Sequence, residues 1–370
     1  MEEDLCIHCE KCISVCPRYL QKAGFSKQDN EHSLYDVPIY AVQSCEEETV
    51  FRCSSGGFVH EASVWALAHG YKAAGVAYNY VKNKTEHRLV TDARDLTELD
   101  GSKYILSDTR IFKRIIREAK KSKENRYFII GTPCQCLSLI KAAENENVRD
   151  QMIFIDIFCH GVPSYKLWIE EIKRIEKKLG TREFDDVKFR YKKDDWHSYC
   201  LKEESKGKTF FGSREREPFY QVFFENVLLN SACMNCQARK TDALSDIRTG
   251  DYWGSRYLDR SDGVSAVYAC TDTGQIIIKE ILSDHKIQII GSADAKDMLQ
   301  SQNMIGYKQK NLHDETMRVL SETGDIGEAI KYYRKRLTGG QKLKRIILQT
   351  SGIIPHMFRL KIKRAYAKFF

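Results

Sequence analysis

Residues 127–135 read Tyr-Phe-Ile-Ile-Gly-Thr-Pro-Cys-Gln, a short apolar run followed at once by a turn and the start of a helix. The same order returns at residues 153–164, where Ile-Phe-Ile-Asp-Ile-Phe is followed by Cys-His-Gly-Val-Pro-Ser. Short apolar runs bounded by Gly and Pro are typical of buried strands, and their alternation with helices favours parallel pairing. These two stretches therefore predict an α/β core.

The rest of the chain fits this architecture. Helices are expected over residues 58–69 and 108–123, and the second of these is basic and amphipathic. We expect strands or strand-containing units over residues 71–81, 187–212 and 264–290. The predicted fold class is α/β with α+β elements, and residues 21–40 are expected to form an irregular linker.

The N-terminal region is a compact cysteine-rich module. Cys6, Cys9, Cys12 and Cys16, followed by Pro17, have the spacing C-x2-C-x2-C-x3-C-P, which bacterial ferredoxins use for a 4Fe-4S cluster. The short gaps let three thiolates and the N–H groups between them wrap one face of a cubane. A structural zinc knuckle is the alternative, although zinc sites normally pair two C-x2-C units. Either Cys16 closes its own cluster or a distant cysteine does.

Four further cysteines form a candidate site for a second 4Fe-4S cluster. Cys233 and Cys236 make another C-x2-C unit, for which a small zinc site or a plain turn is the alternative. Cys134 and Cys159 each follow a predicted strand and precede a predicted helix, where ligands collect in an open α/β sheet. The alternative for each is a buried apolar side chain, the usual role of a lone cysteine.

The chain holds thirteen cysteines, more than an ordinary cytosolic enzyme carries. A reducing compartment disfavours disulfides, so metal ligation explains this number better. Cys45 and Cys53 are alternative ligands for the second site, whereas Cys200 and Cys270 are expected in the core.

Small residues before a predicted helix indicate a phosphate-binding turn. The run 54–57 reads Ser-Ser-Gly-Gly, and small side chains let the backbone approach a phosphate at a helix N-terminus. Lys103, in Gly-Ser-Lys-Tyr, is a candidate partner for a pyrophosphate. A plain turn is the alternative for both strings. Further candidates for cofactor binding are Thr132, in Gly-Thr-Pro-Cys-Gln, and Asp251, in Asp-Ile-Arg-Thr-Gly-Asp-Tyr-Trp-Gly, where a tight turn over the core is the alternative.

The order of these strings over residues 4–270 resembles the coenzyme F420 hydrogenase/dehydrogenase beta-subunit family. The family consists of flavoproteins that bind FAD and 4Fe-4S clusters and move electrons between a deazaflavin or ferredoxin and a substrate. The resemblance implies that Cys134, Cys233 and Cys236 belong to the flavin-proximal cluster region. It also implies that FAD is contacted by Ser54, Ser55, Gly56, Gly57 and Lys103.

This sequence departs from the family pattern in two places. Many relatives carry two tandem ferredoxin motifs, whereas this chain carries one, so the input end of the electron chain is expected to be shortened. The resemblance also ends near residue 310. We predict a ferredoxin-type 4Fe-4S module and linker at 1–40, an N-terminal flavoprotein part at 41–125, a C-terminal α/β flavin and cluster domain at 126–310, and a helical basic tail at 311–370.

Charge is distributed unevenly along the chain. From Lys331 to the end there are twelve Lys and Arg residues and no acidic residue, and subtracting them from the formal net charge of +8 leaves −4 for the preceding residues. A mildly acidic body argues against nucleic-acid binding. Residues 341–370 mix cations with Ile, Phe and Tyr, which suits an anionic membrane surface; the alternative is a solvated terminal helix.

No apolar run of 18 residues is present, and the acidic start lacks the pattern of a signal peptide. We therefore expect a cytoplasmic protein, peripheral at the inner face of the membrane if the tail binds there.

Together these patterns predict an oxidoreductase that depends on FAD and on one or two 4Fe-4S clusters. Electrons are expected to come from a ferredoxin-like or deazaflavin donor and to reach a small organic or lipid-linked sugar substrate through FAD. The sugar rests on analogy with relatives in surface-polysaccharide assembly. His160 is the candidate proton donor, because a His beside a cofactor turn can titrate near neutral pH; a satisfied structural histidine is the alternative. The rival hypotheses are a coenzyme F420-oxidising subunit of a larger complex and a non-catalytic electron-transfer or zinc-stabilised scaffold protein.

Overall fold

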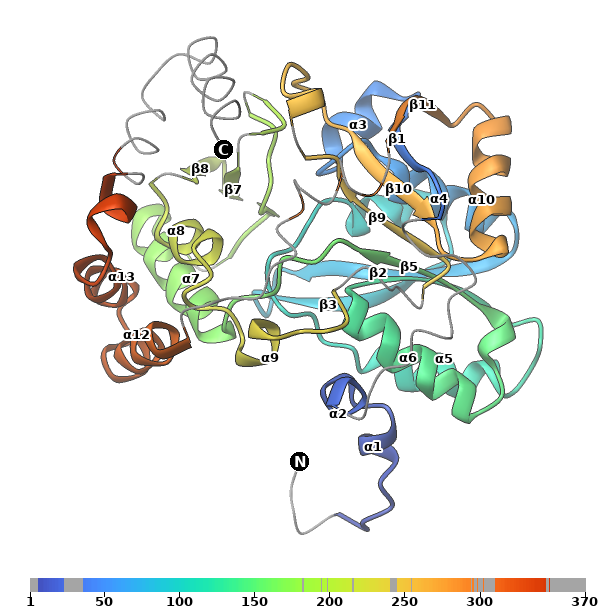
Figure 1. Cartoon of the computed structure of the whole chain (residues 1–370), viewed down its shortest axis with the longest axis horizontal. Coiled ribbons are helices and arrows are strands. Elements are labelled where there is room, and N and C mark those ends of the chain that lie inside the picture. Colours follow the sequence, from blue (N-terminus) through green and yellow to red (C-terminus); the bar gives the residue numbers. More distant parts are fainter. Residues whose placement is uncertain are drawn as a thin grey trace.

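Eight strands pair into one mixed sheet that organises the chain in the computed structural model (Figure 1). The order across the sheet is β11-β1-β10-β9-β5-β4-β2-β3. In that order, the strands are Ile287–Ala293, Ile39–Ser44, Ser265–Ala269, Ile247–Asp251, Met152–Ile157, Arg126–Gly131, Tyr71–Asn79 and Lys84–Val90. The structure describes residues 6–22, 36–181, 183–193, 195–197, 199–214, 216–239, 245–253, 255–293, 295, 298, 302, 310–343 and 346.

The central strands β2, β4, β5 and β9 run parallel, and the outer strands pair antiparallel. Side chains of β5 alternate between two apolar cores: Ile153 and Ile155 face one, and Phe154 faces the other. Helices α4 (Phe58–Ala68) and α10 (Asp272–Ser283) cover the first face, while α5 (Ile111–Ala119) and α6 (Pro133–Asn145) cover the second. A parallel sheet needs both faces covered, because its strands are apolar on both sides.

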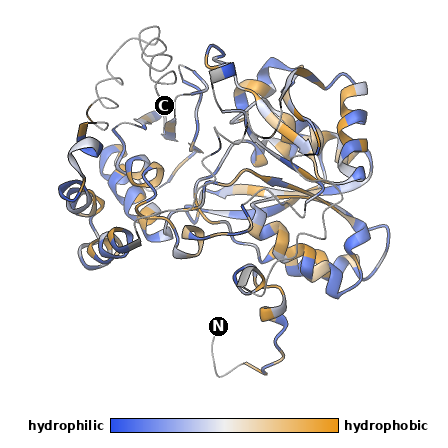
Figure 2. Ribbon diagram, in the orientation of Figure 1, coloured by the Kyte–Doolittle hydropathy of each residue, from blue (hydrophilic) through white to orange (hydrophobic). Residues whose placement is uncertain are grey.

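A second apolar core lies beside the sheet. It joins the small sheet β6-β7-β8 (Asp186–Lys188, Cys200–Ser205, Lys208–Ser213) to four helices. These helices are α7 (Tyr165–Leu179), α8 (Pro218–Phe224), α12 (Lys310–Thr323) and α13 (Ile326–Lys335). Figure 2 shows hydrophobic and hydrophilic residues alternating around them, as amphipathic helices require.

The N-terminal module sits against the end of α6 (Figure 1). Its helices are α1 (Lys11–Ser14) and α2 (Pro17–Lys22), and α2 packs on α6. Lys11 lies 4.0 Å from Glu146, and the Asn145 amide donates to the Ser14 hydroxyl at 3.3 Å. The remaining short elements are α3 (Glu47–Arg52), α9 (Ser231–Met234), η3 (Ala93–Leu99), η4 (Arg149–Gln151) and η5 (Ser255–Tyr257).

The predicted α/β fold class is confirmed, with two differences in detail. The predicted linker overlaps β1, which already begins at Ile39. The helix expected from residue 108 begins only at Ile111, because the Asp108 backbone pairs instead with Thr85 and His87 beside β3 at 3.0 and 2.9 Å.

Three further predictions concern the basic tail, the membrane and the domain boundaries. Residues 344–345 and 347–370 of the predicted basic tail lie outside the described residues. Within the described ranges, no helix combines the length and the apolar character needed to cross a membrane. The predicted domain boundaries stay predictions, although strands from both sides of residue 125 share the large sheet.

A carboxyl group is buried in the second core. Glu203, on β7, is 0% exposed, and neither of its carboxyl oxygens has a hydrogen-bond partner in the described part of the chain. Burial raises the pKa of Glu203 well above its ordinary value, nearby Glu171 raises it further, and Arg174 and Lys178 oppose the rise. The fold therefore favours the protonated, uncharged form of this side chain.

Replacement of Glu203 by Gln should make stability less dependent on pH. Because the folded-state pKa is raised, the stabilising proton is fully bound below the ordinary Glu pKa of about 4.3, and its contribution is lost as pH rises toward the raised value. Glu203→Gln keeps the uncharged shape, so its urea midpoint should exceed that of the wild type at about pH 8 and differ less at about pH 5. Glu204→Gln is the control, because Glu204 pairs with Lys202 at 2.8 Å. A Glu203→Gln midpoint that tracks the wild type at both pH values would contradict the prediction.

Candidate functional site

The carboxyl ends of the parallel strands meet at one edge of the large sheet. Gly131, Ile157 and Asp251 end β4, β5 and β9 there. β10 runs antiparallel to β9 and begins at the same edge, with Ser265 opposite Asp251. This is the edge where open α/β sheets bind ligands. Thr132, Cys134 and Cys159 follow β4 and β5 at this edge, and Asp251 ends β9 there.

Four cysteines gather at this edge from three segments. Cys134 lies in the first turn of α6 and Cys159 follows β5, while Cys233 and Cys236 come from α9 and the turn after it. Burial raises the pKa of Cys134 to about 11, and the neighbouring thiols of Cys236 and Cys233 raise it further. Burial also raises the pKa of Cys159, again with contributions from the other three thiols. The four sulfur atoms thus lie within electrostatic range of one another.

The segments that carry these cysteines are tied together by close backbone contacts. Gly161 has a φ of +107°, and a Cβ added there would lie 3.2 Å from the Cβ of Cys233. The Asn230 N–H donates to the Val162 carbonyl at 2.8 Å. Only glycine allows this approach in this conformation.

Arg239 joins the same two segments through its guanidinium. The side chain is buried, and it donates to the carbonyl oxygens of His160 at 3.0 Å and Cys233 at 3.1 Å. Sequence reasoning missed this residue, because an isolated Arg after a C-x2-C unit carries no pattern of its own.

The described residues do not form a site for a single metal ion. No three His, Cys, Asp or Glu side chains of the described ranges lie close enough to hold one metal ion. A cubane is larger than an ion and keeps its thiolates farther apart than tetrahedral zinc does.

The alternative ligands occupy other places. Cys45 is exposed beside Lys286, and Cys53 is buried next to Asp100. Cys200 and Cys270 are buried, as expected of core residues.

The N-terminal cysteines surround a strained backbone. Cys6, Cys9 and Cys12 are exposed, and the residues between them include His8 with φ 50° and Glu10 with φ 56°. Left-handed conformations are unfavourable for such side chains, and they persist where the local arrangement has a purpose. Alternation of left- and right-handed residues points successive N–H groups into a nest, a device that many iron–sulfur sites use.

The Ser-Ser-Gly-Gly run forms a braced loop between α3 and α4. The Ser54 hydroxyl accepts the Ser102 N–H at 2.6 Å, and the Ser55 hydroxyl donates to the Val264 carbonyl at 2.7 Å. Gly56 packs so tightly on the sheet that a Cβ would lie 2.4 Å from the Val42 carbonyl oxygen. Gly57 has a φ of +89° and directly precedes α4, and no side chain caps this helix N-terminus.

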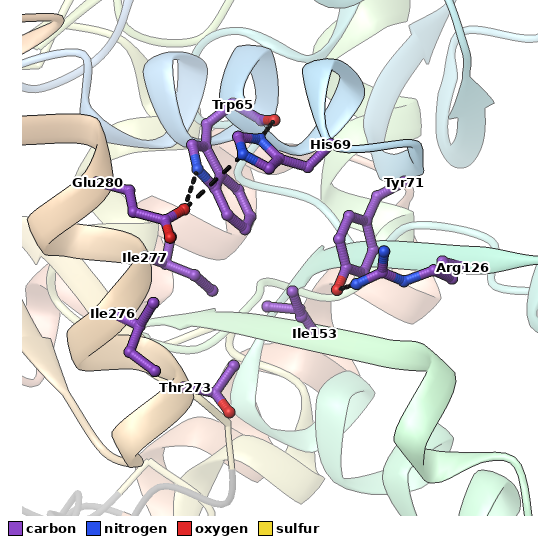
Figure 3. A pocket seen from close by; sticks show the side chains of 9 residues that line it. All are labelled: Trp65, His69, Tyr71, Arg126, Ile153, Thr273, Ile276, Ile277 and Glu280. Atoms are coloured by element: carbon purple, nitrogen blue, oxygen red, sulfur yellow. Dashed lines mark hydrogen bonds and ion pairs between the residues drawn. The ribbon is translucent and has the colours of Figure 1, made fainter. Parts of the chain in front are cut away.

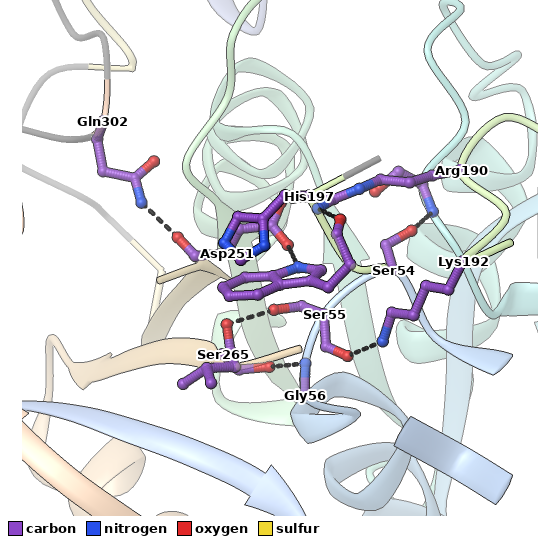
Figure 4. A network of polar contacts seen from close by, with 12 residues as sticks. Ser54, Ser55, Gly56, Arg190, Lys192, His197, Asp251, Ser265 and Gln302 are labelled. Carbon is purple, nitrogen blue, oxygen red and sulfur yellow. Dashed lines mark hydrogen bonds and ion pairs between the residues drawn. The ribbon is translucent and has the colours of Figure 1, made fainter. Parts of the chain in front are cut away.

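Two buried cations that sequence reasoning missed join this loop to the neighbouring turns (Figure 4). The Lys192 ammonium donates to the carbonyl oxygens of Val50 at 2.5 Å and Ser55 at 2.7 Å. Arg190 pairs with Asp251, which also accepts the Trp196 indole N–H at 3.0 Å. Arg190 and Lys192 are spaced i, i+2 in a strand-like run, so they share one face. This spacing was the one feature of the sequence that could have indicated a pair of cations at the site.

Lys103 and Thr132 have partners within the protein. The Lys103 ammonium donates to the Asp100 carbonyl at 2.7 Å, and its removal from water lowers its pKa to about 8. Thr132 and Gln135 form a capping box at the start of α6. Thr132 thus has a structural role, and its predicted contact with a cofactor stays a prediction.

A line of aromatic rings runs from His160, beside Cys159, to Trp253, which follows β9. The Trp253 ring lies 5.9 Å from Tyr199, Tyr199 lies 4.4 Å from Phe224, and Phe224 lies 6.2 Å from the His160 ring, centroid to centroid. The line therefore joins the cysteine group to the end of β9.

His160 lies among aromatic side chains, with its ring 5.1 Å from Phe223. Burial lowers the pKa of His160 to about 4, so the imidazole is uncharged at neutral pH, contrary to the expectation of near-neutral titration. Its role as proton donor therefore rests on sequence position alone.

A cavity of about 250 Å³ lies at the opposite edge of the sheet (Figure 3). Trp65 and His69 stack with ring centroids 4.4 Å apart, and the Trp65 indole donates to Glu280 at 2.9 Å. Arg126 covers the Tyr71 ring at 3.9 Å. None of the predicted site residues lines this cavity.

Residues 124–294 match the family that describes the C terminus of the coenzyme F420 hydrogenase/dehydrogenase beta subunit. This match supports the predicted resemblance to that family. It indicates an oxidoreductase that transfers electrons, as the sequence resemblance predicted. A search of curated proteins finds no match.

The same fold also occurs in a solved complex. A chain of the F420-reducing NiFe hydrogenase complex from Methanosarcina barkeri is similar with a TM-score of 0.52 and 17% identity. The alignment covers 77% of this chain and 91% of that chain. At this identity the likeness establishes a shared fold.

Gly56→Ala should destabilise the protein even when no cofactor is present. The added Cβ would lie 2.4 Å from the Val42 oxygen and 2.8 Å from the Ser265 nitrogen, so backbone must shift. We expect a loss of about 1–3 kcal/mol, seen as a lower thermal midpoint of the cofactor-free protein. Gly340→Ala is the control, because no atom lies within 4 Å of its added Cβ. Equal midpoints for the two variants would show that Gly56 is not a packing requirement.

Proposed function

We propose that this chain is an iron–sulfur flavoprotein oxidoreductase. It takes electrons from a ferredoxin-like donor or from reduced coenzyme F420 and passes them through 4Fe-4S clusters and FAD to an organic substrate. The observation that carries the proposal is the shared sheet edge, where the segments of the four cysteines and the braced serine-glycine loop both lie.

Two sets of cysteines suit two clusters. Cys134, Cys159, Cys233 and Cys236 would hold the inner cluster, within a buried site of ordered backbone. The outer cluster would be held by Cys6, Cys9, Cys12 and Cys16, in a segment whose backbone turns at the left-handed residues His8 and Glu10. Cluster ligation needs thiolates, and hydrogen bonds to the sulfur atoms adjust the reduction potential.

The serine-glycine loop suits the phosphates of FAD. The uncapped start of α4 would offer N–H groups to an anion. Lys103 lies beside Cys53, the residue directly before the serine-glycine loop. Bound FAD would supply the conversion between one-electron and two-electron transfer. Asp251 would act through Arg190 and Trp196, whose positions it fixes.

The second candidate function is a coenzyme F420-oxidising subunit of a larger complex. The similar fold of a chain from an F420-reducing hydrogenase complex favours it. Both functions use the same cofactor site and differ in the molecule that is oxidised. A lipid-linked sugar substrate, a role in surface-polysaccharide assembly and a membrane contact of the tail are further hypotheses about the partners. Rates of FAD reduction by reduced ferredoxin and by reduced F420 distinguish the two donors.

Loss of one cysteine from either group should remove about half of the iron. If each site holds four irons, Cys233→Ser and Cys6→Ser should each lower the iron content of anaerobically purified protein by about half, because each change opens one of two clusters. Cys270→Ser, a buried cysteine outside both groups, should keep the wild-type iron and acid-labile sulfide. Wild-type protein that contains zinc and lacks iron would instead support a scaffold role.

Lys103→Met should weaken FAD binding by about 10–100-fold, because a charged hydrogen bond to phosphate contributes about 1.5–3 kcal/mol. Fluorescence titration of flavin-depleted protein with FAD measures the change. Lys208→Met, an exposed cation on β8, is the control and should bind FAD as the wild type does. Wild-type protein that neither retains nor rebinds flavin would contradict the flavin part of the proposal.

A further inference from the structure

The outward side of α5 and the turn after it carry a dense group of cations, called the basic face below. Residues 110–123 contain one acid, Glu118, and seven basic residues, all of them exposed: Arg110, Lys113, Arg114, Arg117, Lys120, Lys121 and Lys123. On the other side of the helix, Ile115 and Ala119 are buried against the large sheet. The fold therefore presents this positive charge to solvent.

Three of these cations form a row that the helix does not neutralise. Lys113, Arg117 and Lys121 are spaced i, i+4 and i+8, so they lie near one side of the helix and of the turn that follows it. Among the residues that the structure describes, no carboxylate pairs with any of the three, whereas Arg114 pairs with Glu118 at 2.6 Å. Like charges at this spacing repel, and the first turn holds no acid to match the helix dipole. Because the row does not stabilise the helix, an interaction with another molecule explains it better.

The basic face meets the N-terminal module at one carboxylate. Glu146, at the end of α6, pairs with Lys120 just after α5, and its other oxygen lies 4.0 Å from the Lys11 ammonium. Lys11 directly precedes Cys12, one of the exposed cysteines of the predicted outer cluster. Figure 1 shows the module below α5 and α6. The cations and the cysteines therefore belong to one continuous surface.

The module exposes apolar side chains beside its cysteines. Ile7 lies between Cys6 and Cys9 and is 83% exposed, and Ile13, directly after Cys12, is 39% exposed. Protein interfaces combine apolar side chains at the centre with a polar, charged rim. The exposed cysteines with their apolar neighbours, next to the basic face, have this composition.

We propose that the basic face and the N-terminal module form the docking surface for an acidic electron-carrier protein. The inference rests on the proposed function, which assigns an iron–sulfur cluster to the module. In each docking event one electron passes from the reduced carrier to this cluster; the carrier is oxidised, the cluster is reduced, and no bond forms or breaks. The cations steer the negatively charged carrier toward the exposed cysteines and so raise the rate of association.

Stopped-flow reduction of the full-length, cluster-loaded protein by a reduced, acidic bacterial ferredoxin tests the docking surface. A triple variant with Lys113→Gln, Arg117→Gln and Lys121→Gln, the α5 variant, should lower the second-order rate constant at low ionic strength by about tenfold or more, because electrostatic steering is lost. The rate constant of the wild type should fall steeply as salt is added. The two proteins should converge near 1 M salt, where the Debye length is only about 3 Å.

A matched variant removes the same charge from another part of the molecule. Lys173 and Lys177 of α7 and Lys335 of α13 are exposed cations on helices of the second core. Their joint replacement by Gln should keep the rate constant and the salt dependence of the wild type. Reduced methyl viologen, a small cationic reductant that does not need the basic face, should reduce both variants at least as fast as the wild type. That result shows that the cluster is intact in each protein.

The outcomes separate this inference from the proposed function. A ferredoxin rate constant that salt does not change, or that is equal in the wild type and the α5 variant, would overturn the docking surface and leave the oxidoreductase proposal standing. Vesicles of phosphatidylglycerol and phosphatidylcholine that bind the wild type but not the α5 variant, at equal ferredoxin rates, would overturn it in favour of a membrane contact. Wild-type protein purified anaerobically without iron would overturn both proposals.

Discussion

The ion pair between Asp156 and Arg248 lies at the centre of the large sheet, and both candidate sites depend on it. The two residues stand directly opposite each other in the parallel register of β5 and β9, and the guanidinium meets the carboxylate through two bonds of 2.6 and 2.8 Å. Arg248 also donates to the Ala238 carbonyl at 3.3 Å, two residues beyond Cys236. Removing one partner of such a buried pair typically costs about 3–5 kcal/mol. One interaction thus sets the position of the Cys159 loop, the C-x2-C segment and Asp251.

The sequence predicts those site residues whose positions follow from the order and direction of the strands. Cys134 and Cys159 follow two strands that pair in parallel, so their proximity follows from the strand–turn–helix pattern. The ordered cysteine and glycine strings identified the family for the same reason, because they mark turns at that edge.

The part that could not be predicted depends on tertiary contacts. Arg190, Lys192 and Arg239 are ordinary basic residues until the fold surrounds them with carbonyl groups and rings. Gly56 was expected to make room for a phosphate, but its own neighbour is the backbone of β1. Asp108 fits a helix pattern, yet pairing with β3 overrides that local preference. Glu203 carries no sequence signal at all, because its burial depends on how β7 meets the helices.

The position of the N-terminal module has a consequence for how this protein can diversify. Cys134 lies in the first turn of α6, and the module contacts the other end of this helix, which has 13 residues and is about 20 Å long. Under the proposed function, substitutions on the exposed surface of the module would change which reductant it recognises and leave the loops at the far end untouched. Reductant and acceptor specificity would then be inherited as separate traits on a single chain.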